Sequence, residues 1–327
     1  MNSNTFLSSN SKLNSLIQVS SGNIPTQAAH SMQITKMAEA LSKRVDNFEL
    51  ITSGDFWSFV TRAKLDLKHW YGLNSDFSLV RIPINLKQKY PFPENYYGGK
   101  FFYLLSTLYI LYKSPTLVYT RTPAVVKILL KIGVPIVWEL HEIAKAEVFQ
   151  QEILCNDLLI AFVTTSEQLG KIAVKKGLPS QKLIVEPNAV ALDKFLPYQS
   201  QELAKAKIAW ESSKPLIVYT GHLYDYKGMP TVLEIAESMP CWDFVVVGGW
   251  QNDIERIKEL CCSKGLNNVY LKGHVSQALL SDYLYAADVL ILPTSSLWEQ
   301  SEITSPLKLF DYMASQRPVV ASNLPNF

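Results

Sequence analysis

The 327-residue sequence lacks the features that mark several large classes of protein. It carries 31 basic and 29 acidic residues, a net charge of +2, and no run of five like charges, so no nucleic-acid partner is expected. Its four cysteines do not have the spacing of zinc ligands, and they predict buried thiols in a reducing compartment. These cysteines are Cys155, Cys241, Cys261 and Cys262.

Signals for export and for membrane crossing are also missing. Residues 1–14 are polar and rich in Ser and Asn, without the basic start and apolar core of a signal peptide, and predict a disordered tail. The longest apolar stretch, Phe101–Tyr112, is shorter than the roughly 20 residues that cross a bilayer. It predicts a buried helix, with a membrane-docking helix as the alternative. We expect a cytoplasmic protein, either free or at the inner face of a membrane.

What the sequence does contain is a globular composition, with 48% hydrophobic and 18% charged residues, and a length that fits two domains. Short apolar runs rich in β-branched residues alternate with helical patterns. Because these runs are continuously apolar, they predict parallel strands covered on both faces. The runs are Leu16–Val19, Phe48–Ile51, Leu79–Ile84, Leu117–Tyr119, Ile136–Leu140, Ile160–Thr164, Leu183–Val185, Leu216–Tyr219, Phe244–Val247, Val269–Leu271, Val289–Leu292 and Val319–Ala321.

Strands and helices that alternate along nearly the whole chain predict an α/β protein of two Rossmann-like, doubly wound parallel-sheet domains. A polar stretch with scattered prolines separates them, so we place the domains at 15–195 and 214–327, with a linker at 196–213 that has room for a helix. Ligands of such sheets lie beyond the carboxyl ends of the strands. The strand-to-helix turns are therefore the segments where a site is expected.

One such turn is GHLYDYKGMP, residues 221–230, directly after a predicted strand. Gly221 permits a tight turn, and Pro230 suits the first turn of a helix. His222 and Lys227 would then flank a helix N-terminus, where free amides, the helix dipole and an ammonium favour a diphosphate. The alternative is a solvated lysine in a surface loop.

A second turn is TSPLKLFDYMA, residues 304–314. Ser305 is expected as N-cap and Pro306 as the first helical residue, which leaves the amides of Leu307 and Lys308 free for phosphate. Asp311 lies one turn further on the face of Lys308 and is suited to ribose hydroxyls. The alternative is an ordinary capped helix with an i,i+3 ion pair.

The segment TSPLKLFDYMASQRPVVASNLP resembles the nucleotide-sugar segment of family 4 retaining glycosyltransferases, which have the GT-B fold with two domains facing a cleft. Further similar segments occur in the family's order: GHLYDYKG, VVVGG, YLKGHV, DYLYAADVLILPT and, between the domains, PNAVALDKF. The first domain is more thinly similar, through GNIPTQAAHSMQITKMAEAL, VYTR, WELHE and VTTSEQL.

The resemblance implies that Lys227 and Lys308 contact the donor diphosphate and act in catalysis. It implies diphosphate contacts for Leu307 and Ser305, and a ribose contact for Asp311. The first glutamate of the family's paired motif falls on Ile303, as in other Ser-Pro-Leu-Lys variants.

Other donor contacts implied by the resemblance lie at the strand ends. They involve Gly221, Gly248 and, near the base, His274. His222 stands where the family usually has arginine, and a neutral imidazole provides less charge for phosphate.

In the first domain the resemblance implies a loop at Gly22 and a following helix whose His30 touches donor or acceptor, a structural role for His30 being the alternative. His141 would lie near the reacting carbon of the sugar. Arg121 and, in the interdomain segment, Asn188 are further candidates on the cleft and acceptor side.

The expected function is that of a glycosyltransferase (EC 2.4 class) in polysaccharide or related synthesis. The resemblance implies retention at the anomeric carbon. Neither cofactor nor metal is expected, because Lys227, Lys308 and the helix amides would stabilise the leaving diphosphate, and no Asp-x-Asp motif occurs. The acceptor would be a glycan, a lipid-linked acceptor or a small molecule. An NAD-dependent oxidoreductase is disfavoured because no Gly-x-Gly-x-x-Gly fingerprint follows a first strand.

Two alternatives remain open, a nucleotide-sugar epimerase of GT-B fold and a non-catalytic nucleotide-sugar binder. Family members continue beyond the fifth strand of the second domain, so we expect a truncated chain that is less stable than a full enzyme.

Overall fold

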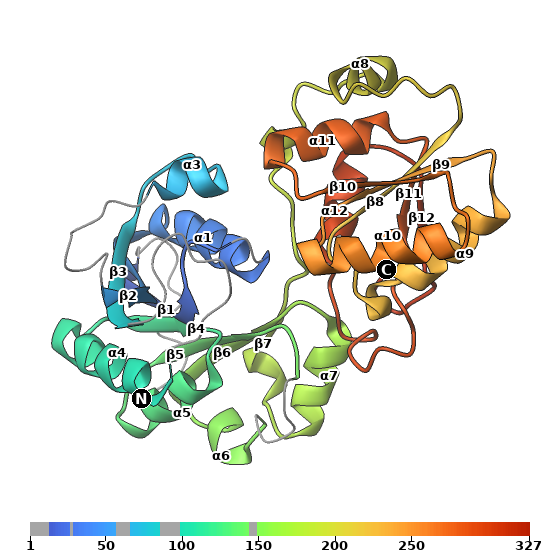
Figure 1. The fold of residues 1–327 in the computed structure, drawn as a ribbon. Coiled ribbons are helices and arrows are strands. Elements are labelled where there is room, and N and C mark those ends of the chain that lie inside the picture. Colours follow the sequence, from blue (N-terminus) through green and yellow to red (C-terminus); the bar gives the residue numbers. More distant parts are fainter. Residues whose placement is uncertain (1–12, 27–28, 57–65, 86–98, 144–148) are drawn as a thin grey trace. The chain divides into compact units, whose positions relative to one another are not determined.

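The computed structural model describes residues 13–26, 29–56, 66–85, 99–143 and 149–327 (Figure 1). The chain forms two compact units, the first made of residues 1–164 and 170–185 and the second of residues 165–169 and 186–327. Each unit is built on one parallel sheet with helices on both faces, as the sequence predicts. Every apolar run predicted as a strand lies within a strand of the structure.

The first unit has a seven-stranded sheet in the order β3-β2-β1-β4-β5-β6-β7. Its strands are β1 (Leu13–Asn23), β2 (Val45–Asp55), β3 (Ser78–Asn85), β4 (Leu117–Thr120), β5 (Ile136–Leu140), β6 (Leu159–Thr164) and β7 (Leu183–Val185). Its helices are α1 (Ala29–Ser42), α3 (Leu67–Tyr71), α4 (Lys100–Lys113), α5 (Pro123–Lys131), α6 (Gln151–Leu154) and α7 (Glu167–Lys175), the last of which spans both units. Helices α1 and α3 pack on one face through a core around Leu50, and α4 and α5 lie on the other (Figure 1).

The second unit has a five-stranded sheet in the order β10-β9-β8-β11-β12. Its strands are β8 (Leu216–Thr220), β9 (Asp243–Val247), β10 (Val269–Gly273), β11 (Val289–Leu292) and β12 (Val319–Ala321). Its helices are α8 (Gln201–Lys207), α9 (Met229–Ser238), α10 (Gln251–Ser263), α11 (Gln277–Ala286) and α12 (Leu307–Ala314). Alternate side chains of β8 supply two cores: Leu216 and Val218 face α8, α11 and α12, whereas Ile217 and Tyr219 face α9 and α10.

The domain limits in the structure differ from those read from the sequence. The main segment of the second unit begins at Glu186. The stretch predicted as a linker is part of this unit, because Ala204 is buried in its core and α8 packs against α11. At the N-terminus, Leu13 and Asn14 belong to β1 rather than to a tail, since they pair with β2 through Leu13. Residues 1–12 of the predicted tail lie outside the described residues.

Two further expectations need correction. Only Cys261 is buried, on the inner face of α10; Cys262 follows it on the exposed face of the same helix, and Cys155 and Cys241 lie exposed in turns. Helix α4 forms where predicted but buries only one face, through Phe102, Ser106, Thr107 and Ile110. Among the described helices, none combines the length and the apolar character needed to cross a membrane.

Candidate functional site

The strand order of the second unit reverses between β8 and β11, the position where doubly wound sheets bind ligands. The turn after β8 leads through a short 3₁₀ helix, Asp225–Lys227, into α9, and the N-terminus of α12 lies against the same turn. Gly221, His222, Lys227 and Lys308, which the sequence singled out separately, therefore act on one another in the structure.

Lys308 is the central cation of this site. Its Nζ lies 4.0 Å above the ring centre of Tyr219 and has no hydrogen-bond partner among the described residues, although the atom is buried. Burial, reinforced by the charge of Lys227, lowers the pKa of Lys308 to about 7. A buried ammonium without a partner costs free energy, so the site is built for an anion that the chain itself does not supply.

Two glycines make room for this arrangement. Gly221 has φ +120°, and a Cβ there would lie 2.9 Å from Lys308 Nζ. Gly248, after β9, has φ +108°, and a Cβ there would lie 2.5 Å from the Gly221 carbonyl oxygen. Side chains at either position would displace the backbone or the ammonium, which is why both are glycine.

The start of α12 offers backbone donors next to Lys308. Pro306, not Ser305, occupies the N-cap position, and Leu309 N donates to Pro306 O at 3.1 Å. The amides of Leu307 and Lys308 find no acceptor in the described part of the chain, as expected for the first turn of a helix. A helix N-terminus with free amides favours phosphate.

The hydroxyl of Ser305 has a different role from the predicted cap. It accepts a hydrogen bond from the backbone N of Asn188 at 3.2 Å, and the Asn188 side chain donates to Ser305 O at 2.5 Å. Asn188 thus lies in the second unit, beside the segment that leads into α12. The polar side chain of Asn188 fixes the loop that precedes α12.

Tyr312 anchors α12 to the sheet. Its hydroxyl accepts from Thr220 N at 2.9 Å and lies 3.4 Å from Ile291 O, so it joins the ends of β8 and β11. Burial raises the pKa of Tyr312 to about 12, which keeps the hydroxyl protonated. The helix start is therefore held at a fixed place over the reversal point of the sheet.

An aromatic stack, defined here as Trp250, His222, Tyr224, Tyr226 and Trp298, lies along the edge of the site. Successive ring centres are 5.7, 5.1, 5.3 and 4.9 Å apart, with interplanar angles between 12° and 29°. Burial and then the charges of Lys308 and Lys227 lower the pKa of His222, so the imidazole is neutral near pH 7.

Lys227 makes cation–π contacts at the Trp298 end of this stack, with its Nζ 4.1 Å from the ring centre of Trp298 and 5.2 Å from that of Tyr226. Such cation–π contacts hold the ammonium without neutralising it. Two cations, Lys227 and Lys308, thus act on the same turn from different elements.

The remaining predicted donor residues lie around this centre. Burial raises the pKa of Asp311 to about 6, partly offset by Lys194, and no ion pair joins Asp311 to Lys308, so the alternative of a simple i,i+3 pair is wrong. His274 is exposed directly after β10, and its charge contributes to the lowered pKa of His222.

A second cluster occupies the strand ends of the first unit and is centred on Glu139 of β5. Arg121, after β4, donates to both carboxylate oxygens at 2.7 and 2.8 Å, Tyr119 donates at 2.5 Å, and His141 Nε2 lies 2.5 Å from Oε1. Burial would raise the pKa of Glu139, but His141 and Arg121 outweigh it and hold the pKa at about 2. Since the carboxylate only accepts, His141 carries its proton on Nε2.

The other two first-unit candidates, Gly22 and His30, are not part of the hydrogen-bonded cluster around Glu139. Gly22 lies within β1, at an irregularity of the ladder between Ser20 and Asn23, so the loop expected there begins later than predicted. His30 lies in the first turn of α1, and burial, with a contribution from Arg121, lowers its pKa.

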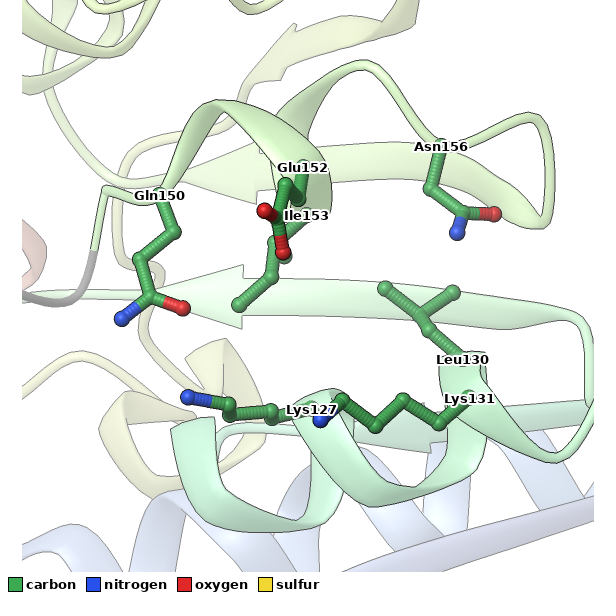
Figure 2. Close-up of a pocket in the computed structure, with 7 residues that line it drawn as sticks. All are labelled: Lys127, Leu130, Lys131, Gln150, Glu152, Ile153 and Asn156. Carbon is green, nitrogen blue, oxygen red and sulfur yellow. The ribbon is translucent and has the colours of Figure 1, made fainter.

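Neither cluster coincides with the pocket in Figure 2. That pocket, of about 120 Å³, lies between α5 and α6 and contains none of the predicted site residues. Its lining consists of Lys127, Leu130, Lys131, Gln150, Glu152, Ile153 and Asn156. In the described ranges, no group of three or more His, Cys, Asp or Glu side chains is placed to hold a metal ion.

Sequence reasoning missed Glu139 and most of the aromatic stack. A glutamate inside the apolar run Ile136–Leu140 is the signal that could have revealed a buried, paired carboxylate. The aromatic residues of the stack come from turns after three different strands, so their stacking has no signature in the sequence.

Comparison with known protein families finds a match within the second unit. Residues 214–327 match the model of the family Glycosyl transferases group 1. No curated protein was matched by the sequence.

Solved structures are similar over nearly the whole chain. A glycosyltransferase from Rickettsia africae ESF-5 superposes with a TM-score of 0.70 at 17% identity, over 97% of this chain and 81% of that one. Sucrose-phosphate synthase from Thermosynechococcus elongatus gives 0.71 at 17%, over 95% and 82%. HepE from Anabaena, in complex with UDP and glucose, gives 0.64 at 14%, over 96% and 82%. Residues 214–327 are thus similar to group 1 glycosyl transferases, and the chain as a whole has the GT-B fold of these structures.

Proposed function

We propose that this protein transfers a sugar from a nucleoside-diphosphate sugar to an acceptor, as a family 4 glycosyltransferase, and that it binds the donor in the second unit. The observation that carries the proposal is the unpaired, buried ammonium of Lys308 beside the free amides of α12. A diphosphate satisfies both at once. The match of residues 214–327 to group 1 glycosyl transferases supports the same conclusion.

In this proposal each group has a physical role in the departure of the nucleotide. Lys308, Lys227 and the amides of Leu307 and Lys308 stabilise the negative charge that develops on the leaving diphosphate, so these residues supply the electrostatic part of catalysis without a metal. Asp311 accepts from ribose hydroxyls. His222 adds a donor rather than a full charge.

The finer features of the proposal are retention at the anomeric carbon, a role for His141 near the reacting carbon, and an acceptor that is a glycan, a lipid-linked acceptor or a small molecule. HepE has been solved with UDP and with UDP-glucose, which makes uridine nucleotides the first donors to test. A cytoplasmic location belongs to the same proposal.

The decisive experiment is calorimetric titration with UDP, GDP and ADP in metal-free buffer. We expect one nucleotide to bind, and Lys308→Met to weaken it tenfold or more, about 1.4 kcal/mol. Lys258→Met, which removes an exposed lysine of α10, is the matched control and leaves the affinity unchanged. If none of the three nucleotides binds, or if both variants behave alike, the donor site is not where we place it.

Catalysis is tested separately with the sugar nucleotide of the base that binds. Release of the free sugar, or its transfer to an added acceptor, supports a transferase. Retention is supported if NMR shows that the product keeps the anomeric configuration of the donor. Epimerisation of the donor, or tight binding without turnover, would establish one of the two alternatives instead.

A further inference from the structure

Helix α4 carries a continuous apolar stripe on the side that faces away from the sheet. The stripe is defined by five exposed side chains: Phe101 (64%), Leu104 (53%), Leu108 (53%), Leu111 (48%) and Tyr112 (82%). Their spacing of three and four residues places them on one side of the helix, opposite the buried Phe102, Ser106 and Ile110. The stripe runs along about 17 Å of helix at 1.5 Å per residue.

Exposed apolar groups of this extent on a helix are not ordinary surface composition. Single exposed apolar side chains are common, but a contiguous set marks a surface that is covered in function. The opposite face of α4 is the one that packs in the first unit, where it is buried. Among the described residues, none covers the stripe.

The charge around the stripe indicates what kind of partner fits. Residues 99–138 contain five cations and no aspartate or glutamate, in a chain whose net charge is only +2. Of these cations, Arg121 is paired with Glu139 and Lys113 with Glu49 at 2.7 Å. Lys100, Lys127 and Lys131 form no ion pair within the ranges that the structure describes.

These three lysines come from α4 and from the helix next to it. Lys100 is the first residue of α4, at the Phe101 end of the stripe. Lys127 and Lys131 are exposed on α5, which packs beside α4, and their side chains extend on the side of α5 toward α6 (Figure 2). Glu152 of α6 lines the same pocket as Lys127 and Lys131 but is paired with neither. Ile132, at the end of α5, adds another exposed apolar side chain.

We propose that the α4–α5 face docks on an anionic lipid surface. The apolar stripe inserts among the acyl chains near the headgroups, the aromatic rings of Phe101 and Tyr112 lie at the interface, and Lys100, Lys127 and Lys131 contact lipid phosphates. An apolar stripe with aromatic ends and neighbouring lysines is the pattern of a helix that lies in the plane of a membrane surface.

A second copy of this chain fits the face less well. A two-fold contact brings the same patch against itself, so the three unpaired lysines would face their own equivalents across the interface. Anionic lipid removes that repulsion. The proposal does not depend on the glycosyltransferase function, because no donor-site residue takes part.

The test is co-sedimentation of the full chain with vesicles. We expect binding to vesicles of phosphatidylcholine mixed with phosphatidylglycerol, weakening with salt, and much weaker binding to phosphatidylcholine alone. The double variant Leu104→Glu, Leu108→Glu is expected to lose binding roughly tenfold or more. Leu203→Glu, at an equally exposed leucine of α8, is the matched control.

The electrostatic part is tested by removing Lys100, Lys127 and Lys131 as alanines, which lowers binding and its salt dependence. Removal of Lys175, Lys176 and Lys258, three exposed lysines elsewhere, leaves both unchanged. Circular dichroism confirms that each variant is folded. Equal binding by the stripe variant and its control, or no binding to anionic vesicles, overturns the proposal, as does a dimer in solution that Leu104→Glu, Leu108→Glu dissociates.

Discussion

Proton uptake should accompany nucleotide binding, because burial and the charge of Lys227 hold the pKa of Lys308 at about 7 in the free protein. A bound diphosphate favours the charged ammonium and returns its pKa to the ordinary value of about 10.4 or above. The complex therefore binds a proton that the free protein lacks at alkaline pH. Affinity must fall as the pH rises above 7.

The magnitude follows from the fraction of protein that carries the ammonium. That fraction is about one half at pH 7 and about one hundredth at pH 9, so the dissociation constant rises roughly 50-fold, or about 2.3 kcal/mol. Below pH 7 other groups interfere, since the terminal phosphate titrates near pH 6 and the lowered pKa of His222 lies in that range. The window from pH 7 to 9 isolates Lys308.

Calorimetry with the nucleotide that binds, at pH 7, 8 and 9, measures this slope, and buffers of different ionisation enthalpy report the proton taken up. Lys308→Met removes the titrating group, so its weaker affinity stays flat with pH. Wild-type affinity that changes less than about threefold across the window, or an equal slope in Lys308→Met, refutes the reasoning. The stability of the free protein depends on pH in the opposite direction from the affinity. Unfolding restores the ordinary, higher pKa of Lys308, so the contribution of Lys308 to the free energy of unfolding rises with pH.

Three substitutions test other parts of the structure. Gly221→Ala places a methyl 2.9 Å from Lys308 Nζ at φ +120°, and should weaken nucleotide binding about tenfold in a folded protein; unchanged affinity contradicts the packing. Tyr312→Phe leaves the Thr220 amide without its hydroxyl partner and should cost about 1–3 kcal/mol in urea unfolding. Glu139→Gln breaks the cluster with Arg121 and His141 and should cost about 3–5 kcal/mol. Because its pKa is about 2 against 4.5 unperturbed, wild-type stability from Glu139 is complete above pH 4.5 and is lost toward pH 2, a dependence that Glu139→Gln should lack.

The parallel strands were predictable because burial on both faces leaves a continuous apolar run such as Leu216–Tyr219. The location of Lys308 and Lys227 at strand-to-helix turns was predictable for the same topological reason. Each of these signals is local in the sequence and needs no knowledge of distant contacts.

What could not be predicted depends on contacts between distant residues. Ser305 has the sequence pattern of a helix cap, but its hydroxyl accepts a hydrogen bond from the backbone N of Asn188. This partner is 117 residues away and is not visible in the local sequence. Glu139 gains its partners from β4 and from the turn after its own strand only when the sheet forms. The exposure of α4 is similar: an apolar run indicates burial, yet only the packed structure shows that one side remains uncovered.

The aromatic stack has a consequence for observing this protein in solution. Five rings from the turns after β8, β9 and β11 are in series, with Trp250 at one end and Trp298 at the other. A ligand that draws Lys227 away from the Trp298 ring changes the electric field at an indole. The fluorescence emission of Trp298 should therefore shift when a ligand binds. Ligand binding can then be followed by intrinsic fluorescence, without an added label.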